Sequence, residues 1–294
     1  MRFLTALFTS WIAFATASFA QAGQPTDGAL GFQRAVTPVM EQITEFHNLL
    51  LIVITVITLI VLALLLYVVF KFRASANPVP KKFSHNTLIE IIWTAVPVLI
   101  LVVIAVPSFR LLYAQDVIPD GQREYYGEVV AAPAFTIKAT GYQWYWSYEY
   151  ADLGIGEYFS NMIPDDEIDL AAGQLRLLSV DYPVVVPVGA TVRMQVTAAD
   201  VIHNWAMPSF GIKMDAIPGR LNETWFRADE EGTYFGQCSE LCGLNHAFMP
   251  IEVRVVSQEA FDAWAAAAAE DPDAANALLA EYETDRRATR LAAR

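Results

Sequence analysis

The stretch Gly236-Gln-Cys-Ser-Glu-Leu-Cys-Gly-Leu-Asn-His-Ala-Phe-Met249 carries the most information in this 294-residue chain. It holds both cysteines of the protein, Cys238 and Cys242, followed by His246 and Met249 in the spacing C-x3-C-x3-H-x2-M. Thiolate, imidazole and thioether are the ligands that soft copper ions prefer. A mononuclear blue-copper site uses one Cys, one loop His, a weak axial Met and a second His from elsewhere. The additional thiolate would allow two copper ions to share two bridging sulfur atoms.

The expected second histidine is His203, because it follows the β-rich stretch Ala190–Val196. Two cysteines in an exported domain more often form a disulfide than a metal site. The nearby His246 and Met249, together with His203, favour the metal site over the disulfide. Zinc is a poorer candidate than copper, because zinc has little use for a thioether ligand.

Apolar segments near the N-terminus predict a membrane anchor. The chain is 55% hydrophobic and only 17% charged, which is unusual for a soluble protein. Residues 1–20 have the pattern of a cleaved secretory signal peptide and leave a short periplasmic segment, 21–48. Residues 49–70 and 88–109 are each long enough to cross a bilayer. The connecting loop, 71–87, carries four basic and no acidic residues and is therefore expected in the cytoplasm. Both ends of the mature chain then face the periplasm.

Charge separates the anchor from the rest of the chain. From Leu111 to Arg294 there are 28 acidic and 12 basic residues, whereas the whole chain has a net charge of −13. An acidic domain argues against nucleic acid as a partner and attracts cationic proteins. Solubility alone would explain the same charge equally well.

The region 110–257 has the short alternating segments and turn residues of an all-β domain. Strands flanking a ligand loop match a cupredoxin-like Greek-key barrel, while residues 151–173 are expected to form a polar, turn-rich insertion. A helical tail is expected over residues 258–294, divided into two short helices at Pro272. Strands are expected over residues 135–140, 143–150, 175–180, 184–188, 191–197, 224–227 and 251–256.

The cysteine loop, His203 and the aromatic run Gly141-Tyr-Gln-Trp-Tyr-Trp-Ser-Tyr-Glu-Tyr150 resemble subunit II of the haem–copper cytochrome c oxidases of bacterial aa3-like type. The resemblance covers roughly residues 30 to 260. It implies a two-pass protein of the bacterial inner membrane with a periplasmic copper domain. It also implies a binuclear copper A centre that takes electrons from cytochrome c and passes them to haem in subunit I, where oxygen reduction is coupled to proton pumping. Subunit I, and subunit III beside it, would be the partner chains.

The resemblance also assigns individual ligands. It gives His203 and Met249 to one copper, and His246 with the backbone carbonyl of Glu240 to the other, with Cys238 and Cys242 as bridges. The free side chain of Glu240 would bind a magnesium or manganese ion shared with subunit I, and a carboxylate suits such a hard cation.

Two further residues receive roles from the resemblance. Trp144 would be the point where electrons enter, although strict alternation along residues 142–150 would bury it with Trp146, Tyr148 and Tyr150. Glu90 would mark the mouth of a proton path, and an ionisable residue at membrane depth is a functional candidate in its own right. Snorkelling to the interface is the structural alternative for Glu90.

Acids that flank the aromatic run and the His203 strand end are the candidates for docking a basic cytochrome. They are Glu149, Asp152, Asp181 and Asp200.

Three other functions share parts of this pattern. A copper chaperone would place C-x3-C on a thioredoxin-like fold and usually has Pro after the second Cys, where this chain has Gly243. A quinol-oxidising relative would lack the ligand set, and nitrous oxide reductase is a longer, soluble propeller enzyme. The intact ligand set therefore favours an electron-accepting oxidase subunit.

Overall fold

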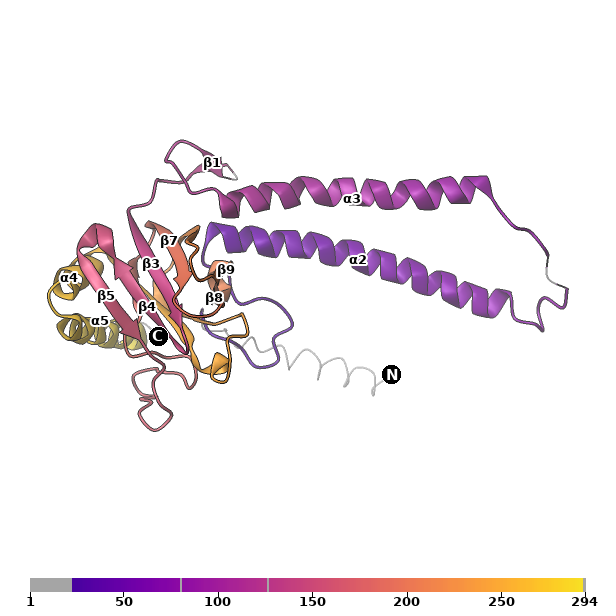
Figure 1. The fold of residues 1–294 in the computed structure, drawn as a ribbon. Coiled ribbons are helices and arrows are strands. Elements are labelled where there is room, and N and C mark those ends of the chain that lie inside the picture. The colour runs from indigo at the N-terminus through magenta and orange to yellow at the C-terminus, as the bar shows by residue number, and fades with distance from the viewer. Residues whose placement is uncertain (1–22, 80, 126, 293–294) are drawn as a thin grey trace.

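Two long helices form a hairpin that extends away from a β-domain (Figure 1). The computed structural model describes residues 23–79, 81–125 and 127–292 of the chain. Helix α2 spans Pro38–Lys71 and helix α3 spans Thr87–Asp116. Within these described ranges, they are the two helices long and apolar enough to cross a membrane. Both are longer than the apolar runs, and the extra turns are buried against the β-domain at Met40 and Ala114. The predicted signal peptide, residues 1–20, lies outside the described residues.

Side chains at the start of each long helix explain where it begins. Thr37 accepts a hydrogen bond from the Met40 amide, 3.1 Å away, and Pro38 occupies the first turn. Asn86 caps α3 in the same way, accepting from the Ile89 amide at 3.2 Å. Such caps satisfy amides that have no partner within the helix.

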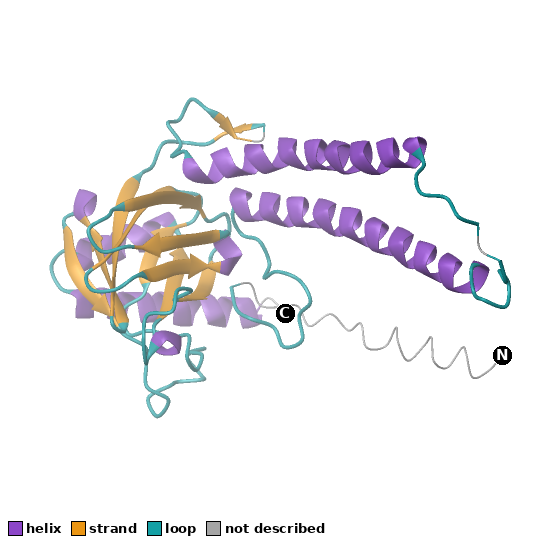
Figure 2. Ribbon diagram, turned by 45° about the vertical axis from the view of Figure 1, so that its right-hand side comes forward, coloured by secondary structure: helices purple, strands orange, loops and turns teal. Residues whose placement is uncertain are grey.

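The β-domain contains a five-stranded sheet in the order β10-β7-β3-β4-β5 and a three-stranded sheet in the order β11-β12-β6. A separate pair, β8–β9, lies near the start of α2 in Figure 1, and Figure 2 shows the strands gathered at one end of the helical hairpin. A small hairpin of β1 (Glu124–Tyr125) and β2 (Glu128–Val129) follows α3. The remaining strands are β3 (Phe135–Tyr142), β4 (Tyr145–Tyr150), β5 (Ile155–Ser160), β6 (Val184–Pro187), β7 (Thr191–Ala198), β8 (His203–Met207), β9 (Ile212–Ala216), β10 (Asn222–Arg227), β11 (Gly232–Gln237) and β12 (Pro250–Val256).

Alternating apolar side chains build the core between these sheets. In β3 the fully buried Ile137 and Ala139 face inward, and in β7 the fully buried Met194 and Val196 do the same. The two strands run parallel, with Ile137 opposite Met194. Non-consecutive neighbours of this kind require crossovers between the layers, as in a Greek key. The predicted helical hairpin followed by an all-β barrel is therefore confirmed.

One strand prediction is wrong, and the expected insertion is only partly correct. Residues 175–180 form turns, with Leu177 at a φ of 65°, and only Val180 makes an isolated bridge, to Met162. The expected turn-rich insertion at 151–173 contains strand β5, which pairs with β4. Its three exposed residues, Gly156, Glu157 and Phe159, hide the strand pattern in the sequence.

The tail forms helices α4 (Gln258–Ala268) and α5 (Pro272–Ala292), which pack against the barrel. Phe261 stacks on Phe135 with ring centroids 5.2 Å apart, and Trp264 lies 5.4 Å from Tyr150. The tail thus covers the end of the core formed by β3 and β4.

Candidate metal centre

The cysteine loop connects two antiparallel strands, β11 and β12, at one end of the barrel. The amide of Cys238 donates to the Met249 carbonyl at 3.3 Å, which closes the loop at its base. Gly236, at the end of β11, has no room for a side chain, because an added Cβ would lie 1.9 Å from the Ala206 carbonyl oxygen of β8. The loop is therefore held against β8, the strand that begins with His203.

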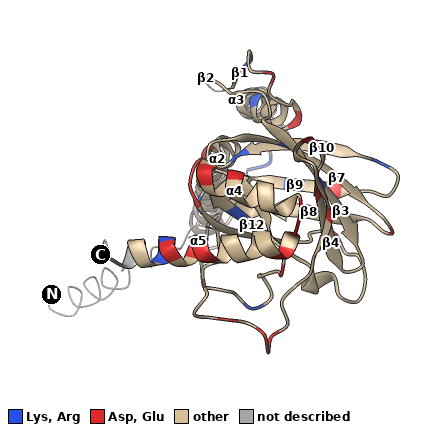
Figure 3. Ribbon diagram, turned by 90° about the vertical axis from the view of Figure 1, so that its left-hand side faces the viewer, with Lys and Arg blue, Asp and Glu red and all other residues tan. Residues whose placement is uncertain are grey.

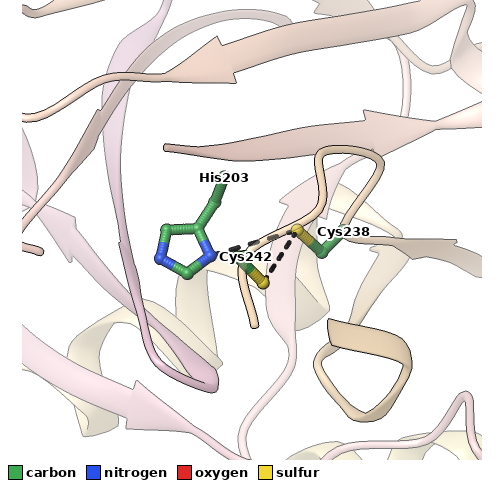
Figure 4. Close-up of side chains that lie close together, drawn as sticks. All are labelled: His203, Cys238 and Cys242. Carbon is green, nitrogen blue, oxygen red and sulfur yellow. Dashed lines mark hydrogen bonds between the residues drawn. The ribbon is translucent and has the colours of Figure 1, made fainter. Parts of the chain in front are cut away.

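Sulfur and nitrogen atoms converge inside this loop. The two thiol sulfurs are 3.9 Å apart, and His203 Nδ1 lies 4.0 Å from Cys238 Sγ (Figure 4). Nδ1 of His246 is 3.6 Å and Sδ of Met249 is 3.5 Å from Cys242 Sγ. His203, both cysteines and Met249 are buried, whereas His246 is half-buried. The ligand types predicted from the sequence are brought together in one place.

The other nitrogen of His203 is fixed by a carboxylate. His203 Nε2 lies 2.9 Å from Asp200 Oδ1, and the Asp200 carboxylate also accepts from the amides of Gln143 and Val201. Proton donation from Nε2 to Asp200 leaves Nδ1 as the lone-pair nitrogen facing the sulfurs. A histidine ligand held by a second-sphere carboxylate is the common arrangement at metal sites.

The two thiols differ in acidity. Burial opposes ionisation of Cys238, but hydrogen bonding with His203 and nearby backbone groups outweighs it and lowers the pKa to about 7. Burial, and then the charge of Cys238, raises the pKa of Cys242 to about 12. A metal ion that binds both sulfurs must therefore displace a proton from Cys242.

These residues fit a metal ion better than a disulfide. A disulfide needs sulfurs about 2.05 Å apart, and both cysteines are free at 3.9 Å. Two thiolates that share a metal at about 2.3 Å each are separated by no more than about 4.6 Å, so the observed separation is compatible with bridging. The ligand atoms of His203, Cys238 and Cys242 all lie within 4.8 Å of one another. A thiolate, imidazole and thioether set of this kind suits copper.

Trp144 lies in the turn between β3 and β4, against the cysteine loop. Its Nε1 donates to the Cys242 carbonyl at 3.2 Å, and Nε2 of Gln143 donates to the same oxygen at 2.7 Å. Gly243 allows Gln143 and Trp144 to approach the loop closely, because a Cβ at this position would lie only 3.1 Å from each of their side chains. Trp146 is fully buried, whereas Trp144 is half-buried. Strict alternation therefore fails at Trp144, because the residue belongs to the turn and not to the strand.

Glu240 presents its backbone and its side chain to different surroundings. Its carbonyl oxygen is 3.3 Å from Cys238 Sγ, while its side chain is exposed outside the loop. The backbone thus faces the sulfurs, and the carboxylate is accessible to ligands from outside the chain.

Glu90 lies in the first turn of α3, far along the hairpin from the β-domain. Its Oε1 accepts a hydrogen bond from the Asn86 amide at 3.1 Å. The carboxylate therefore completes the helix cap, which the sequence pattern had not indicated. Glu90 shares one face of α3 with Thr87, Ile91 and Thr94.

The four candidate docking acids lie in different places. Asp200 contacts His203 at 2.9 Å, and Asp181 accepts a hydrogen bond from the Asn161 amide at 2.7 Å beside the same end of the sheet. Glu149 pairs with Lys138 at 3.3 Å, and Asp152 accepts from the Thr136 amide at 2.8 Å, both toward the other end. Figure 3 shows acidic residues over several elements of the β-domain and the tail. The acids predicted as one docking face are thus not gathered at one site.

Two contacts were not predicted from the sequence, the hydrogen bond between Asp200 and His203 and the contact of Gln143 with the loop. The spacing Asp200-x2-His203 was the available signal for the first, because it brings a carboxylate close to the ligand. No signal in the sequence indicated the second.

Comparison with known proteins identifies the family. The model described as "Cytochrome C oxidase subunit II, periplasmic domain" matches residues 135–256, and the corresponding transmembrane domain matches residues 25–111. The chain is 51% identical over 249 residues to the protein of Rickettsia bellii named "Probable cytochrome c oxidase subunit 2", covering 85% of this chain and 87% of that protein. It is 46% identical over 256 residues to cytochrome c oxidase subunit 2 of Oenothera berteroana, covering 85% and 93%.

A solved structure gives a further match. The periplasmic domain of subunit II of cytochrome oxidase from Bradyrhizobium japonicum is 56% identical, covering 47% of this chain and 96% of that domain, with a TM-score of 0.44. With its two membrane-spanning helices and its periplasmic-domain match, this is a two-pass membrane protein. The chain belongs to the cytochrome c oxidase subunit II family.

Proposed function

We propose that this chain is the electron-accepting subunit II of a respiratory cytochrome c oxidase and holds a binuclear copper A centre. The observation that carries the proposal is the convergence of two free thiols, two imidazole nitrogens and one thioether at the end of the barrel. The ligands would be His203, Cys238, the Glu240 carbonyl, Cys242, His246 and Met249. When bound, a thiolate-bridged copper pair supplies one-electron redox chemistry between cytochrome c and the haem of subunit I.

The residues around the centre would keep its geometry constant. Asp200 holds the His203 ring through Nε2, and both cysteines of the loop are buried. Gly236 allows the backbones of β8 and β11 to approach closely. Because these contacts hold the ligands in place, little reorganisation would be needed when the copper pair gains or loses an electron. A low reorganisation energy suits electron transfer.

Trp144 is the proposed residue through which electrons arrive. The support is its half-buried position and its direct hydrogen bond to the Cys242 carbonyl. The indole therefore provides a short route, through one hydrogen bond and a few covalent bonds, from the protein surface to the proposed ligand Cys242.

Two other sites complete the proposal. The exposed carboxylate of Glu240 would bind a magnesium or manganese ion at the border with subunit I, since hard cations prefer oxygen ligands. Glu90 would mark the mouth of a proton path into subunit I, supported by its place as an ionisable residue in the first turn of the apolar helix α3. Cytochrome c would be the donor, with subunit III as a further partner.

The proposed location is the inner membrane of a bacterium, with the barrel and both mature termini in the periplasm. The support is the basic loop between the two apolar helices, with Lys71, Arg73, Lys81 and Lys82 and no acid. A signal peptide over residues 1–20 would deliver the N-terminus to the outer side.

The test is a metal count on the full chain, purified in detergent and loaded with copper. Two copper ions per chain and the purple absorption and EPR spectrum of a mixed-valence pair are expected. One copper per chain, or a disulfide between Cys238 and Cys242 in the metal-loaded protein, would overturn the proposal. A copper chaperone with C-x3-C would have a thioredoxin-like fold. The loop of this chain lies instead between two strands of a β-domain, so the fold argues against a chaperone.

A further inference from the structure

An open groove runs between the two tail helices, α4 and α5. It has a volume of about 330 Å³. Its lining combines small or apolar side chains with acidic ones, among them Ala260, Ala263, Leu278, Glu259, Glu281 and Asp285. Both helices lie on the side of the β-domain opposite to the membrane hairpin (Figure 1). The groove therefore faces away from the hairpin, and the function proposed above makes no use of it.

The floor of the groove is fixed to the barrel. Leu279 of α5 is buried. The Tyr282 hydroxyl donates to the Glu231 carboxylate at 3.0 Å and accepts from the Ser257 amide at 3.1 Å. The Ser257 side chain in turn caps α4 by accepting from the Ala260 amide at 3.2 Å. These contacts hold both helices in place, so the groove exists before any partner arrives.

The open side of the groove is partly apolar. Leu278 of α5 remains 43% exposed although it lies between the two helices. On the α4 side, Ala260 and Ala263 carry only a methyl group, which leaves room above them. Glu281 and Asp285 follow Leu278 at spacings of three and seven residues, so the three side chains share one helix face. The groove thus offers an apolar strip bordered by carboxylates.

The negative charge of the groove is not compensated from within the tail. Residues 258–294 include eight acidic and four basic residues, and Figure 3 shows acidic residues along α5. Arg286 pairs with Glu231 at 3.2 Å, and Arg287 donates to the Ala171 carbonyl at 2.5 Å. Among the residues that the structure describes, the three groove carboxylates have no ion-pair partner. A ligand in the groove would therefore meet a net negative charge.

We infer that this groove docks a basic amphipathic helix of a partner protein. An apolar side chain of that helix would pack on Ala260, Ala263 and Leu278, as in other complexes where a helix lies in a groove. Lysine or arginine side chains beside it would pair with Glu259 on one wall and with Glu281 and Asp285 on the other. Nucleic acids and anionic lipids do not fit, because the carboxylates repel phosphate groups.

The length of the groove predicts weak, reversible docking. It spans about two helical turns on each side, which is less than the contact area of a stable complex. Its charged pairs would be exposed, so binding should weaken as the salt concentration rises. The apolar contact should remain, because burial of apolar surface does not depend on charge.

The test uses the full chain in detergent and a fluorescent helical peptide, with binding measured by anisotropy. The probe peptide carries a stripe of Leu at positions i, i+3, i+4 and i+7 flanked by Lys. One comparison peptide has the same composition in an order that gives no stripe, and another has Glu in place of Lys. The probe should bind best, the peptide without a stripe more weakly, and the acidic peptide least.

Two variants separate the charged from the apolar contribution. Glu281→Gln/Asp285→Asn should weaken binding of the probe roughly fivefold at low salt, the loss expected for two exposed charge pairs. The matched control is Glu41→Gln/Glu45→Gln, which removes two exposed acids four residues apart on α2. Ala263→Phe fills the groove and should weaken binding about tenfold at every salt concentration, as when one leucine-sized side chain is no longer buried.

The outcomes decide whether the groove is the docking site. Loss of binding in both groove variants, with the α2 control unchanged, supports the inference. Equal binding of the peptide without a stripe, or wild-type affinity of Ala263→Phe, would show attraction to charge alone and overturn it. Self-association of the chain that Ala263→Phe removes would assign the groove to a second copy and would also overturn it. Helical content and copper content of the variants report on folding and should stay the same.

Discussion

The two ends of the β3–β4 hairpin use similar polar residues for different purposes. At the turn, Gln143 and Trp144 both bond the Cys242 carbonyl, and the Gln143 amide bonds Asp200. At the other end, Glu149 pairs with Lys138 across the same two strands. The polar groups of the turn thus serve the metal loop, whereas those of the far end serve the sheet itself. Distance along one hairpin therefore separates the residues that contact the candidate metal loop from those that only support the sheet.

The largest effect should come from removing a bridging sulfur in the loop that the turn contacts. Cys242→Ser should abolish binding of the copper pair, because an alcohol is a far poorer ligand for copper than a thiolate. Copper per chain measured by mass spectrometry, together with the EPR spectrum, checks this. Ser239→Ala is the matched control, since Ser239 is exposed in the same loop. Normal copper content in Cys242→Ser would show that the sulfur is not a ligand.

Trp144→Gln should produce the next largest effect, a collapse of electron transfer from reduced cytochrome c. The residue is half-buried in a turn, so the fold and the copper content should persist. Stopped-flow oxidation of the donor measures the rate. Trp146→Ala serves as the contrast, because Trp146 is fully buried and its truncation should cost about 3–5 kcal/mol of folding stability. A stable, copper-loaded Trp144→Gln protein with the wild-type rate would remove the electron role from Trp144.

The burial of Trp146 followed from the alternation in the sequence, whereas the half-buried position of Trp144 did not. The proposed metal ligands could be predicted because four of their five side chains lie within a short loop whose spacing limits the geometry. The position of Trp144 could not, since period-2 alternation assumes a continuous strand, and the turn at Gln143–Trp144 interrupts it. Strand β8 was missed because all five of its residues are buried, which removes the alternation.

Long-range contacts were even less accessible from the sequence. Residues 175–180 have a strand-like composition, but Leu177 adopts a positive φ and the Val180 amide bonds the buried Glu252 of β12 instead of a neighbouring strand. Similarly, the choice of Asp200 as the partner of His203 depends on side-chain conformations that no pattern encodes.

Asp200→Asn should have an intermediate effect, because Asp200 connects the turn to a proposed ligand. Loss of a second-sphere carboxylate typically lowers metal affinity by about 10- to 100-fold. Competition with a copper chelator measures the affinity, and the EPR hyperfine pattern should change with it. Asp181→Asn is the matched control, since this acid bonds Asn161 and no metal ligand. If Asp200→Asn changed only the salt-dependent association with cytochrome c, Asp200 would be a docking residue without a positioning role.

The smallest effect is expected at the far end of the hairpin, for Glu149→Gln. Glu149 lies five residues beyond Trp144, roughly 17 Å along an extended strand, which exceeds the Debye length of about 10 Å at 0.1 M salt. Its ion pair with Lys138 is between side chains that are 36% and 42% exposed, so stability should change by less than about 1 kcal/mol. The association rate with a cationic cytochrome c, measured by stopped flow, should change little at 0.1 M salt. At about 0.01 M salt, where the Debye length reaches about 30 Å, a measurable decrease should appear. A decrease at 0.1 M as large as the decrease at 0.01 M would mean that the donor also covers the far end of the hairpin, and the distinction between its two ends would fail.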